Sequence, residues 1–190
     1  MCGRMNVSDH PGIRQLMKDL GIPVYPEPNS DLRPTQLLLA LTGPNPSDYE
    51  TMQWGIKPTW SKSLLINAKS ETVSEKKTFS GAFKERRCLI PCSGWYEWKD
   101  EGGPKKQKYA FTHVDQGAFL MAGIWFNHDG HNQVVTLTTA PQGPCKEIHA
   151  RMPVIIQPQD LNFWFNGTDN ELTPLMSSHA EDSILIEKTS

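Results

Sequence analysis

Apolar residues near the start of the chain recur at the three- and four-residue spacing of a helix face: Ile13, Leu16, Met17 and Leu20. Side-chain oxygens often bind the first backbone N–H groups of a helix, so Ser8 or Asp9 is expected to cap it. Pro11 suits the first turn, where its missing N–H is not needed. Gly21 can take the left-handed conformation that ends many helices. The pattern therefore predicts one amphipathic helix before Gly21.

The next segments alternate between loop and strand composition. Residues 23–35 are rich in proline and polar side chains, and they predict an ordered loop. Residues 36–42 and 49–54 are expected to form strands joined by the turn GPNPSD. Residues 70–84 are expected to form short helical pieces.

From Arg87 onward, β-branched and aromatic residues dominate, and turn residues separate the runs. The predicted strands are CLIP, GWYEW, KYAFTH, FLMAGIWF and QVVTLTT. The breaks EGGPKK and NHDGHN predict hairpin connections. Residues 158–160 begin a last predicted helix, with Leu161 and Phe165 on one face.

Predicted strands outnumber helices and do not alternate with them, which favours the α+β class. A length of 190 residues with 37% hydrophobic content allows one domain with a real core. No internal repeat or low-complexity tract interrupts it. We therefore expect a single domain over residues 1–190, built on a curved, partly closed antiparallel sheet with short helices beside it.

Charge is unevenly distributed along the chain, although the net value is only −2. Residues 55–110 carry 12 basic and 6 acidic side chains, whereas residues 111–190 carry 3 and 9. A basic middle suits a polyanionic partner, and an unevenly charged solvated surface is the alternative. No run approaches the ~20 apolar residues of a membrane span, and the first residues lack the apolar region of a secretion signal. We expect a cytoplasmic protein, associated with the nucleoid if it is bacterial.

Cys2 follows the initiator methionine, in a chain whose four cysteines are too few for a disulfide framework. Removal of Met1 would give Cys2 a free α-amine, and the reference pKa of about 7.7–8.0 leaves much of this amine nucleophilic at neutral pH. The amine can form a Schiff base with an aldehyde, and the thiol of the same residue can then close a thiazolidine ring. The alternative is a small residue in a frayed terminus. Gly3 permits close backbone approach to a ligand, and Arg4 offers a fork for phosphate or carboxylate.

Three further residues are candidates for proton transfer or sugar binding. His149 titrates near neutral pH, as an acid or base must. Glu97 shares a strand face with Trp95, and desolvation there would raise the pKa of its carboxyl group. Asn67 follows an apolar run, where its amide can bind a sugar oxygen or cap a turn. The alternatives for His149 and Glu97 are a surface imidazole and an outward carboxylate on a half-buried strand.

Two other chemistries can be drawn from the same residue types. Cys88, Cys92, Cys145 and His149 could be assembled into a zinc site. Cysteines four apart in an extended strand are roughly 13 Å from each other, too far for one tetrahedral ion, so no metal is expected. A Cys, His and Asn set also permits a thiol peptidase with an N-terminal nucleophile, although no local signature of the familiar cysteine proteases is present.

Seven short motifs follow one another in a specific order. They are MCGR (1–4), RPTQ (33–36), WGIKPTW (54–60), INAKSET (66–72), RRCLIP (86–91), GWYEW (94–98) and IHARMPVI (148–155). With these motifs the chain resembles the SRAP family (SOS response-associated peptidase), also described as abasic-site processing or 5-hydroxymethylcytosine-binding proteins. The resemblance runs from residue 1 to about 165, and residues 166–190 form a divergent tail.

The resemblance implies a protein that recognises abasic sites in single-stranded DNA and bonds to them through Cys2 as a stable thiazolidine. By the same resemblance, Asn67 and Glu97 contact the sugar and steer protons. His149 is linked to ring opening, lyase chemistry and reversal of the crosslink. The implied fold is one α+β domain with a central barrel-like sheet and a positively charged DNA channel. No cofactor is implied, and we expect a monomer.

The resemblance also implies a set of DNA-contacting residues: Gly3, Arg4, Pro34, Trp60, Lys69, Lys77 and Arg151. Its basic members would bind phosphates without sequence preference, and Pro34 and Trp60 would stack or wedge beside the lesion. Lys69 stands where an arginine is common, and Asp31 stands where an asparagine is usual and adds a charge that would not help DNA binding. Two alternatives stay open: a non-covalent module for single-stranded or modified DNA, and a peptidase with an N-terminal nucleophile.

Overall fold

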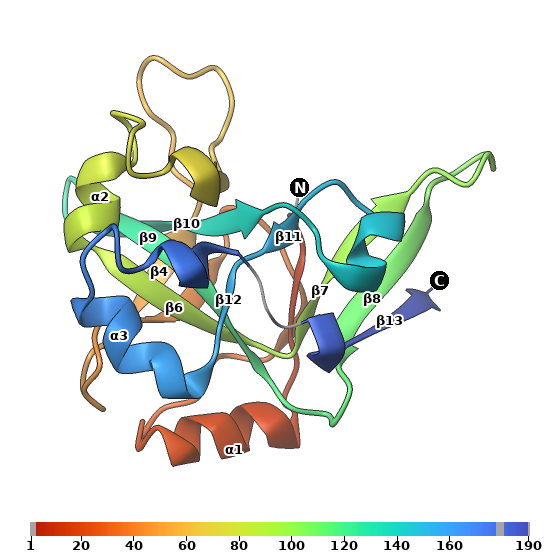
Figure 1. The fold of residues 1–190 in the computed structure, drawn as a ribbon, viewed down its shortest axis with the longest axis horizontal. Coiled ribbons are helices and arrows are strands. Elements are labelled where there is room, and N and C mark those ends of the chain that lie inside the picture. Colours follow the sequence, from red (N-terminus) through yellow and green to blue (C-terminus); the bar gives the residue numbers. More distant parts are fainter. Residues whose placement is uncertain (1–2, 178–180, 190) are drawn as a thin grey trace.

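Two β-sheets around one apolar core organise the chain in the computed structural model, which describes residues 3–177 and 181–189 (Figure 1). The strands are β1 (Met5–Val7), β2 (Asn29–Leu32), β3 (Leu37–Leu41), β4 (Tyr49–Trp54), β5 (Asn67–Lys69), β6 (Arg87–Cys92), β7 (Gly94–Lys99), β8 (Gln107–His113), β9 (Phe119–His128), β10 (His131–Thr139), β11 (Met152–Pro153), β12 (Ile155–Ile156) and β13 (Ile184–Thr189). The α-helices are α1 (Pro11–Asp19), α2 (Ser80–Glu85) and α3 (Leu161–Asn166). The 3₁₀ helices are η1 (Ser70–Thr72), η2 (Gly143–Glu147), η3 (Pro158–Asp160), η4 (Thr173–Met176) and η5 (Glu181–Ser183).

A closed barrel forms the larger sheet, because the strand order β10-β4-β3-β6-β9 returns to β10. This confirms the predicted α+β class and the barrel-like sheet. The pairing in this sheet is antiparallel, as predicted, except that β10 runs parallel to β4 and to β5. Parallel neighbours need a long crossover, and here the chain between β5 and β10 supplies it by first building β6 to β9.

The smaller sheet is antiparallel throughout, with the order β13-β8-β7-β1-β2. The predicted hairpin connections are confirmed, since EGGPKK joins β7 to β8 and NHDGHN joins β9 to β10. The β7–β8 connection projects far from the body of the molecule (Figure 1). Within the divergent tail, β13 pairs with β8 over its full length, from Ile184 opposite His113 to Thr189 opposite Lys108.

The predicted helix before Gly21 is confirmed as α1, and Gly21 ends it with a φ of 68°. The predicted cap is wrong. Nδ1 of His10 accepts the N–H of Gly12 at 3.1 Å, while Ser8 and Asp9 bond to other side chains. An imidazole nitrogen can serve as the capping acceptor because it presents a lone pair like a carboxylate oxygen.

Two other local predictions differ in detail. The stretch predicted as a loop over residues 23–35 contains β2, which completes the smaller sheet by pairing with β1. The helical pieces predicted over residues 70–84 are present as η1 and α2, and the predicted last helix begins with η3 and continues as α3. In α3, Leu161 faces the core as predicted and Phe165 packs against it, while Trp164 is fully buried. No helix among the described residues is long and apolar enough to cross a membrane.

Arg87 lies at the start of β6, between α2 and α3, and its side chain is only 7% exposed. Its guanidinium donates to five backbone carbonyl groups: Trp164 at 2.8 Å, Phe83 at 2.8 Å, Phe165 at 2.9 Å, Gly167 at 2.9 Å and Lys84 at 3.4 Å. These carbonyl oxygens belong to the last turns of two helices, which leave acceptors unsatisfied. Arg87 therefore ties both helices to the barrel.

Replacing Arg87 by methionine should destabilise the fold by about 3–5 kcal/mol, because several buried carbonyl groups lose their donor. Urea unfolding followed by circular dichroism measures the change. Lys84→Ala, on the exposed side of α2, is the control and should stay within about 0.5 kcal/mol of the wild type. A loss in Arg87→Met no larger than in the control would contradict this role.

Candidate functional site

Glu97 is buried because it shares a face of β7 with Trp95. Side chains alternate along a strand, and the face that carries Trp95 points into the core, where its ring stacks on Phe111 with 4.9 Å between centroids. Glu97, two residues further, is only 3% exposed. The shared face predicted for Trp95 and Glu97 is confirmed, and the alternative of an outward carboxylate is excluded.

His149 follows η2 and turns its ring toward Glu97. Its Nε2 lies 3.7 Å from Oε2 of Glu97. Its Nδ1 lies against the backbone of Arg151, 3.0 Å from the carbonyl oxygen and 3.1 Å from the amide nitrogen. One tautomer donates to that oxygen and the other accepts from that N–H, so both neutral forms keep the ring in place. The structure therefore brings together two residues that are 52 positions apart in the sequence.

Burial shifts the pKa values of Glu97 and His149 in opposite directions, and both shifts favour the uncharged form. Desolvation raises the pKa of the Glu97 carboxyl group to about 7, and it lowers the pKa of the His149 imidazole below its usual value. Each shift favours the uncharged form of the group. Near neutral pH the site thus holds a neutral imidazole beside a carboxyl group that exchanges readily between its two forms, which suits general acid–base chemistry.

Asn67 begins β5, and its side chain joins the polar face of β10. The Thr136 hydroxyl bonds to Oδ1 of Asn67, and the two residues are also partners in the parallel β5–β10 ladder. In the same ladder, Lys69 lies opposite Thr138. Asn67 is thus held against β10, the strand whose Thr138 carbonyl group accepts a hydrogen bond from Arg151.

Arg151 anchors the segment that carries His149. Its guanidinium makes two hydrogen bonds to the carboxylate of Glu71, at 2.7 and 2.8 Å, and it also donates to the carbonyl oxygen of Thr138. The Arg151 side chain is 17% exposed. A paired, largely buried guanidinium is well suited to holding a loop. Arg151 was expected to contact DNA, and its observed contacts are with the protein.

Arg4 precedes β1 and lies beside the Glu97 strand. The N–H of Tyr96 donates to the carbonyl oxygen of Arg4 at 3.0 Å, and the Arg4 guanidinium lies 5.3 Å from the centroid of the Trp98 ring. Gly3 is half-buried. Cys2, the expected nucleophile, lies outside the described residues.

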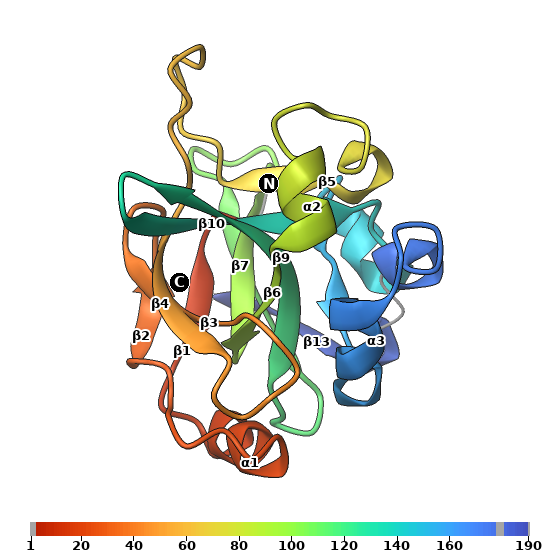
Figure 2. The same cartoon turned by 90° about the vertical axis from the view of Figure 1, so that its left-hand side faces the viewer.

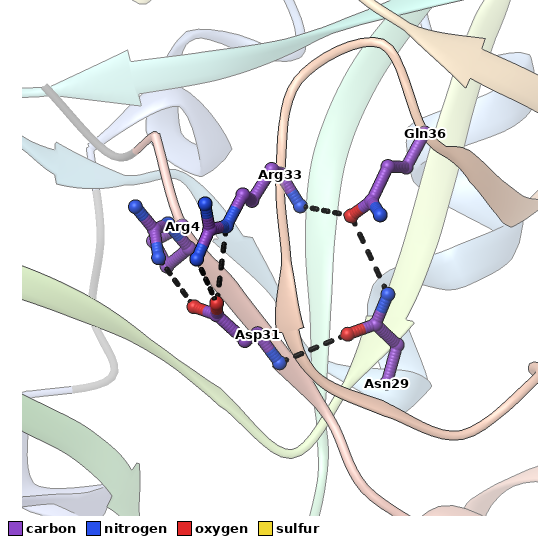
Figure 3. Close-up of polar contacts among 5 residues, drawn as sticks. All are labelled: Arg4, Asn29, Asp31, Arg33 and Gln36. Atoms are coloured by element: carbon purple, nitrogen blue, oxygen red, sulfur yellow. Dashed lines mark hydrogen bonds and ion pairs between the residues drawn. The ribbon is translucent and has the colours of Figure 1, made fainter.

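Asp31 pairs with two arginines at this edge of the smaller sheet (Figure 3). Nη1 of Arg4 bonds to one carboxylate oxygen, and Arg33 donates to the other through Nε at 3.0 Å and Nη2 at 2.6 Å. The two guanidinium groups hold the pKa of the Asp31 carboxyl group below its usual value. Figure 3 also shows the Asp31 N–H bonded to Asn29 Oδ1 at 3.0 Å. Asn29 is bonded in turn to Gln36 at 3.4 Å.

Pro34 lies in a strained turn that joins β2 to β3. Thr35 has a φ of 76°, which is unfavourable for a β-branched residue. The turn is held by hydrogen bonds from the Thr35 N–H to the Trp54 carbonyl oxygen at 2.8 Å and from the Arg33 N–H to the Gln36 side chain at 2.7 Å. Strain of this kind persists only where the surroundings enforce it, and it often marks functional sites.

Trp60, Lys69 and Lys77 are all exposed. Trp60 lies in the segment between β4 and β5, which projects from the molecule (gold in Figure 2). Its side chain is 68% exposed and lines a hollow of about 290 Å³ with Lys57, Phe126 and His128. Lys77 lies between η1 and α2.

Three of the four cysteines are buried in the core. Cys88 and Cys92 lie in the same extended strand, β6, as predicted, and desolvation raises the pKa of both thiols, that of Cys92 to about 12. Cys145 is buried in η2. Within residues 3–177 and 181–189, no group of three or more His, Cys, Asp and Glu side chains is placed to hold a metal ion.

Sequence reasoning missed four residues of this region: Asp31 and Arg33 as an ion pair, Glu71, and Thr136. The pair of Glu71 and Arg151 spans 80 positions, and no local pattern could reveal it. Thr136 could have been found, because threonines two apart in an otherwise apolar strand indicate a polar face.

Comparison with known proteins points to one family of sequences. The family model described as "SOS response associated peptidase (SRAP)" matches residues 1–189. The abasic site processing protein YedK of Escherichia coli is 30% identical, over 86% of this chain and 79% of that protein. YoqW of Bacillus subtilis, which bears the same description, is 28% identical over 93% of this chain and 85% of that protein. For YoaM of the same species, 30% identical, the match covers 74% of this chain and 66% of that protein.

Solved structures support the fold alone, since their sequences are distant. A protein from Bacteroides thetaiotaomicron superposes with a TM-score of 0.83 at 20% identity, over 100% of this chain and 92% of that one. A protein from Bordetella bronchiseptica gives 0.82 at 20% identity, over 100% of both chains.

The raised pKa of Glu97 makes stability depend on pH. Between the reference value of 4.5 and about 7, the folded protein binds more protons than the unfolded chain, so stability falls as pH rises through this window. Glu97→Gln, which stays neutral, should therefore be more stable than the wild type at about pH 8, by up to roughly 3 kcal/mol at 1.36 kcal/mol per pKa unit. Near pH 4.5 the difference should largely vanish. Urea unfolding at both pH values measures it.

Glu85→Gln removes an exposed carboxylate from α2 and controls for the change of charge. The pH-dependent gain should be confined to Glu97→Gln. Equal stability of wild type and Glu97→Gln at about pH 8 would show that the carboxylate is not desolvated.

Proposed function

The chain belongs to the SRAP family, and from this premise we propose that it processes abasic sites in single-stranded DNA. We propose further that, once Met1 is removed, Cys2 links covalently to the sugar as a thiazolidine. Asn67, Glu97 and His149 would assist the reaction. Lyase and autoproteolytic activities would draw on the same residues.

The observation that carries this proposal is the pair formed by buried Glu97 and half-buried His149, because the chain just before β1 runs beside the strand of Glu97. Met5 lies opposite Trp95 in the β1–β7 ladder, and Tyr96 bonds to Arg4. Continued by one step, the same antiparallel register would set Gly3 opposite Glu97. Cys2 is the next residue toward the N-terminus, and the proposal requires it to reach the pair.

The other cysteines support the choice of Cys2. Cys88, Cys92 and Cys145 are buried in the core, where a thiol is not accessible to DNA, and desolvation also raises the pKa of the Cys88 and Cys92 thiols. A thiolate or a thiol positioned for proton transfer is what attacks an electrophile. Nucleophilic thiol chemistry on DNA would therefore have to use Cys2.

The proposed reaction begins with opening of the abasic sugar. His149 removes the proton of the hemiacetal hydroxyl, the bond between the anomeric carbon and the ring oxygen breaks, and that oxygen is protonated to leave an aldehyde. The α-amine of Cys2 adds to the aldehyde carbon and gives a carbinolamine. Glu97 protonates the carbinolamine hydroxyl group, which leaves as water, and the nitrogen returns a proton to Glu97 as the imine forms. The thiol sulfur then bonds to the imine carbon while its proton passes to nitrogen. The net product is a thiazolidine and one water.

DNA would lie over the exposed residues around this pair. Lys69, at the end of β5, and Arg4, just before β1, would contact phosphates. Pro34, on its strained turn, and Trp60, on the projecting segment, would support unstacked bases beside the lesion. Gly3 and Lys77 complete the proposed DNA-binding set. Arg151 would contribute mainly by holding His149.

Crosslinking tests the proposal directly. The mature protein, confirmed by intact mass to begin at Cys2, should give a shifted band with abasic single-stranded DNA on a denaturing gel. Cys2→Ala should lose the band entirely, because neither the thiol nor the ring closure remains. Cys92→Ala, which removes a buried thiol, is the matched control and should keep the band. A band that persists in Cys2→Ala would refute the covalent role.

Two other outcomes would favour the alternative functions. If the wild type gives no band but binds DNA in a salt-sensitive way that Cys2→Ala leaves unchanged, the protein is a non-covalent binding module. If the chain is cleaved beyond Met1, it is a peptidase.

Trp60 provides a separate test of DNA contact. Trp60→Ala should weaken binding of unmodified single-stranded DNA about tenfold, since stacking of a base on an aromatic ring contributes about 1–3 kcal/mol. Fluorescence anisotropy measures the affinity. Phe163→Ala, which removes another exposed aromatic ring from α3, should leave the affinity unchanged. Equal affinities of the two variants would remove Trp60 from the interface.

A further inference from the structure

Arg4 and Arg33 converge on one anion, and that anion belongs to the protein. Both oxygens of the Asp31 carboxylate are engaged, one by Arg4 and the other by two nitrogens of Arg33 (Figure 3). Planar guanidinium forks bind carboxylate and phosphate with the same geometry. The place that Asp31 occupies between the two arginines is therefore one that a phosphate could take.

Strand alternation explains why the three charges meet on the outer surface. Met5 and Leu32 are partners in the β1–β2 ladder and both point into the core. Their neighbours, Arg4 and Asp31, project to the opposite face of the same two strands. Arg33 follows Asp31 after the end of β2 and is fixed by its backbone bond to Gln36.

Arg33 is the exposed member of this cluster. Its side chain is 59% exposed and that of Asp31 is 42% exposed, while Arg4 is 24% exposed. In the other arginine–carboxylate pair, Glu71 is 46% exposed, but Arg151 is only 17% exposed and also donates to a backbone carbonyl group. Exposed pairs are weak and are screened by salt. A weak pair of this kind is one that a stronger anion could replace, and the Trp98 ring, 5.3 Å from the Arg4 guanidinium, is a second contact for Arg4 that does not involve Asp31.

We propose that Asp31 is an internal substitute for a DNA phosphate, which holds Arg4 and Arg33 in their binding arrangement and yields its place to a phosphate when DNA binds. This inference rests on the proposed function. It makes Asp31 a residue that limits affinity for undamaged DNA. The carboxylate keeps both guanidinium groups ordered, and it also competes with each phosphate that approaches them.

The test is non-covalent binding of an unmodified oligothymidylate, measured by fluorescence anisotropy over a series of salt concentrations. Asp31→Asn should bind several-fold more tightly than the wild type at low salt. Its plot of log affinity against log salt should be steeper by about 0.7 for each phosphate gained, the value for single strands. Asp115→Asn, on the exposed β8–β9 turn beside α1, makes the same change of charge and should move neither quantity.

A double variant with Arg33→Gln distinguishes local competition at Arg33 from a general electrostatic effect of removing one negative charge. If Asp31 competes for a phosphate at Arg33, the gain of Asp31→Asn should largely disappear in the Arg33→Gln background. A gain that survives there, or one that Asp115→Asn reproduces, would overturn the inference. The inference would also be overturned if Asp31→Asn, shown to be folded by circular dichroism, bound the oligonucleotide with the same affinity as the wild type. Failure of the wild type to bind either this oligonucleotide or abasic DNA would instead refute the proposed function, and this inference with it.

Discussion

The burial of Trp95 in β7 is the constraint on which the site depends. Its ring stacks on Phe111 and meets Phe119 edge-on in the core between the sheets. Because side chains alternate along a strand, β7 cannot bury Trp95 without also burying Glu97. The same packing that stabilises the sheet therefore desolvates a carboxyl group and raises its pKa to about 7. Acid–base character at neutral pH follows from the architecture of the core.

Arginine side chains make three sets of ionic and polar contacts that link separate segments of the molecule. Arg87 fastens the ends of α2 and α3 to the barrel through backbone carbonyl groups. Arg151 fastens the His149 segment to η1 and β10. Arg4 and Arg33 share Asp31 at the surface. The exposed fraction of the side chain rises from Arg87 to Arg151 and then to Arg4 and Arg33. The number of bonds to backbone carbonyl groups falls in the same order. Of these three arrangements, the exposed pair of Arg33 and Asp31 is the one proposed to exchange its partner for a ligand.

Local sequence patterns predicted most of the helices and strands, but few of the strand pairings and side-chain contacts between them. The strands β6 to β10 were predictable because β-branched and aromatic runs are separated by turn residues, and α1 was predictable from its apolar spacing. The cap of α1 was not, because His10 is an unusual acceptor that competes with two better ones. β2 was missed because its residues, Asn29 to Leu32, are mostly polar and become a strand only by pairing with β1. The parallel alignment of β10 with β4 and β5 depends on how the barrel closes.

The sequence by itself determined which side chains could carry chemistry: the face shared by Trp95 and Glu97, the motifs around Asn67 and His149, and the position of Cys2. The shared face of Trp95 and Glu97 follows from their spacing of two residues, because side chains alternate along a strand. The motifs and the position of Cys2 can be read from the sequence alone. Only the tertiary structure decided that His149 faces Glu97, that Glu71 holds Arg151 and that Asp31 lies between two arginines. Apart from Asp31 and Arg33, these pairs join residues 27 to 80 positions apart, and they meet because barrel closure and sheet register bring the backbones together.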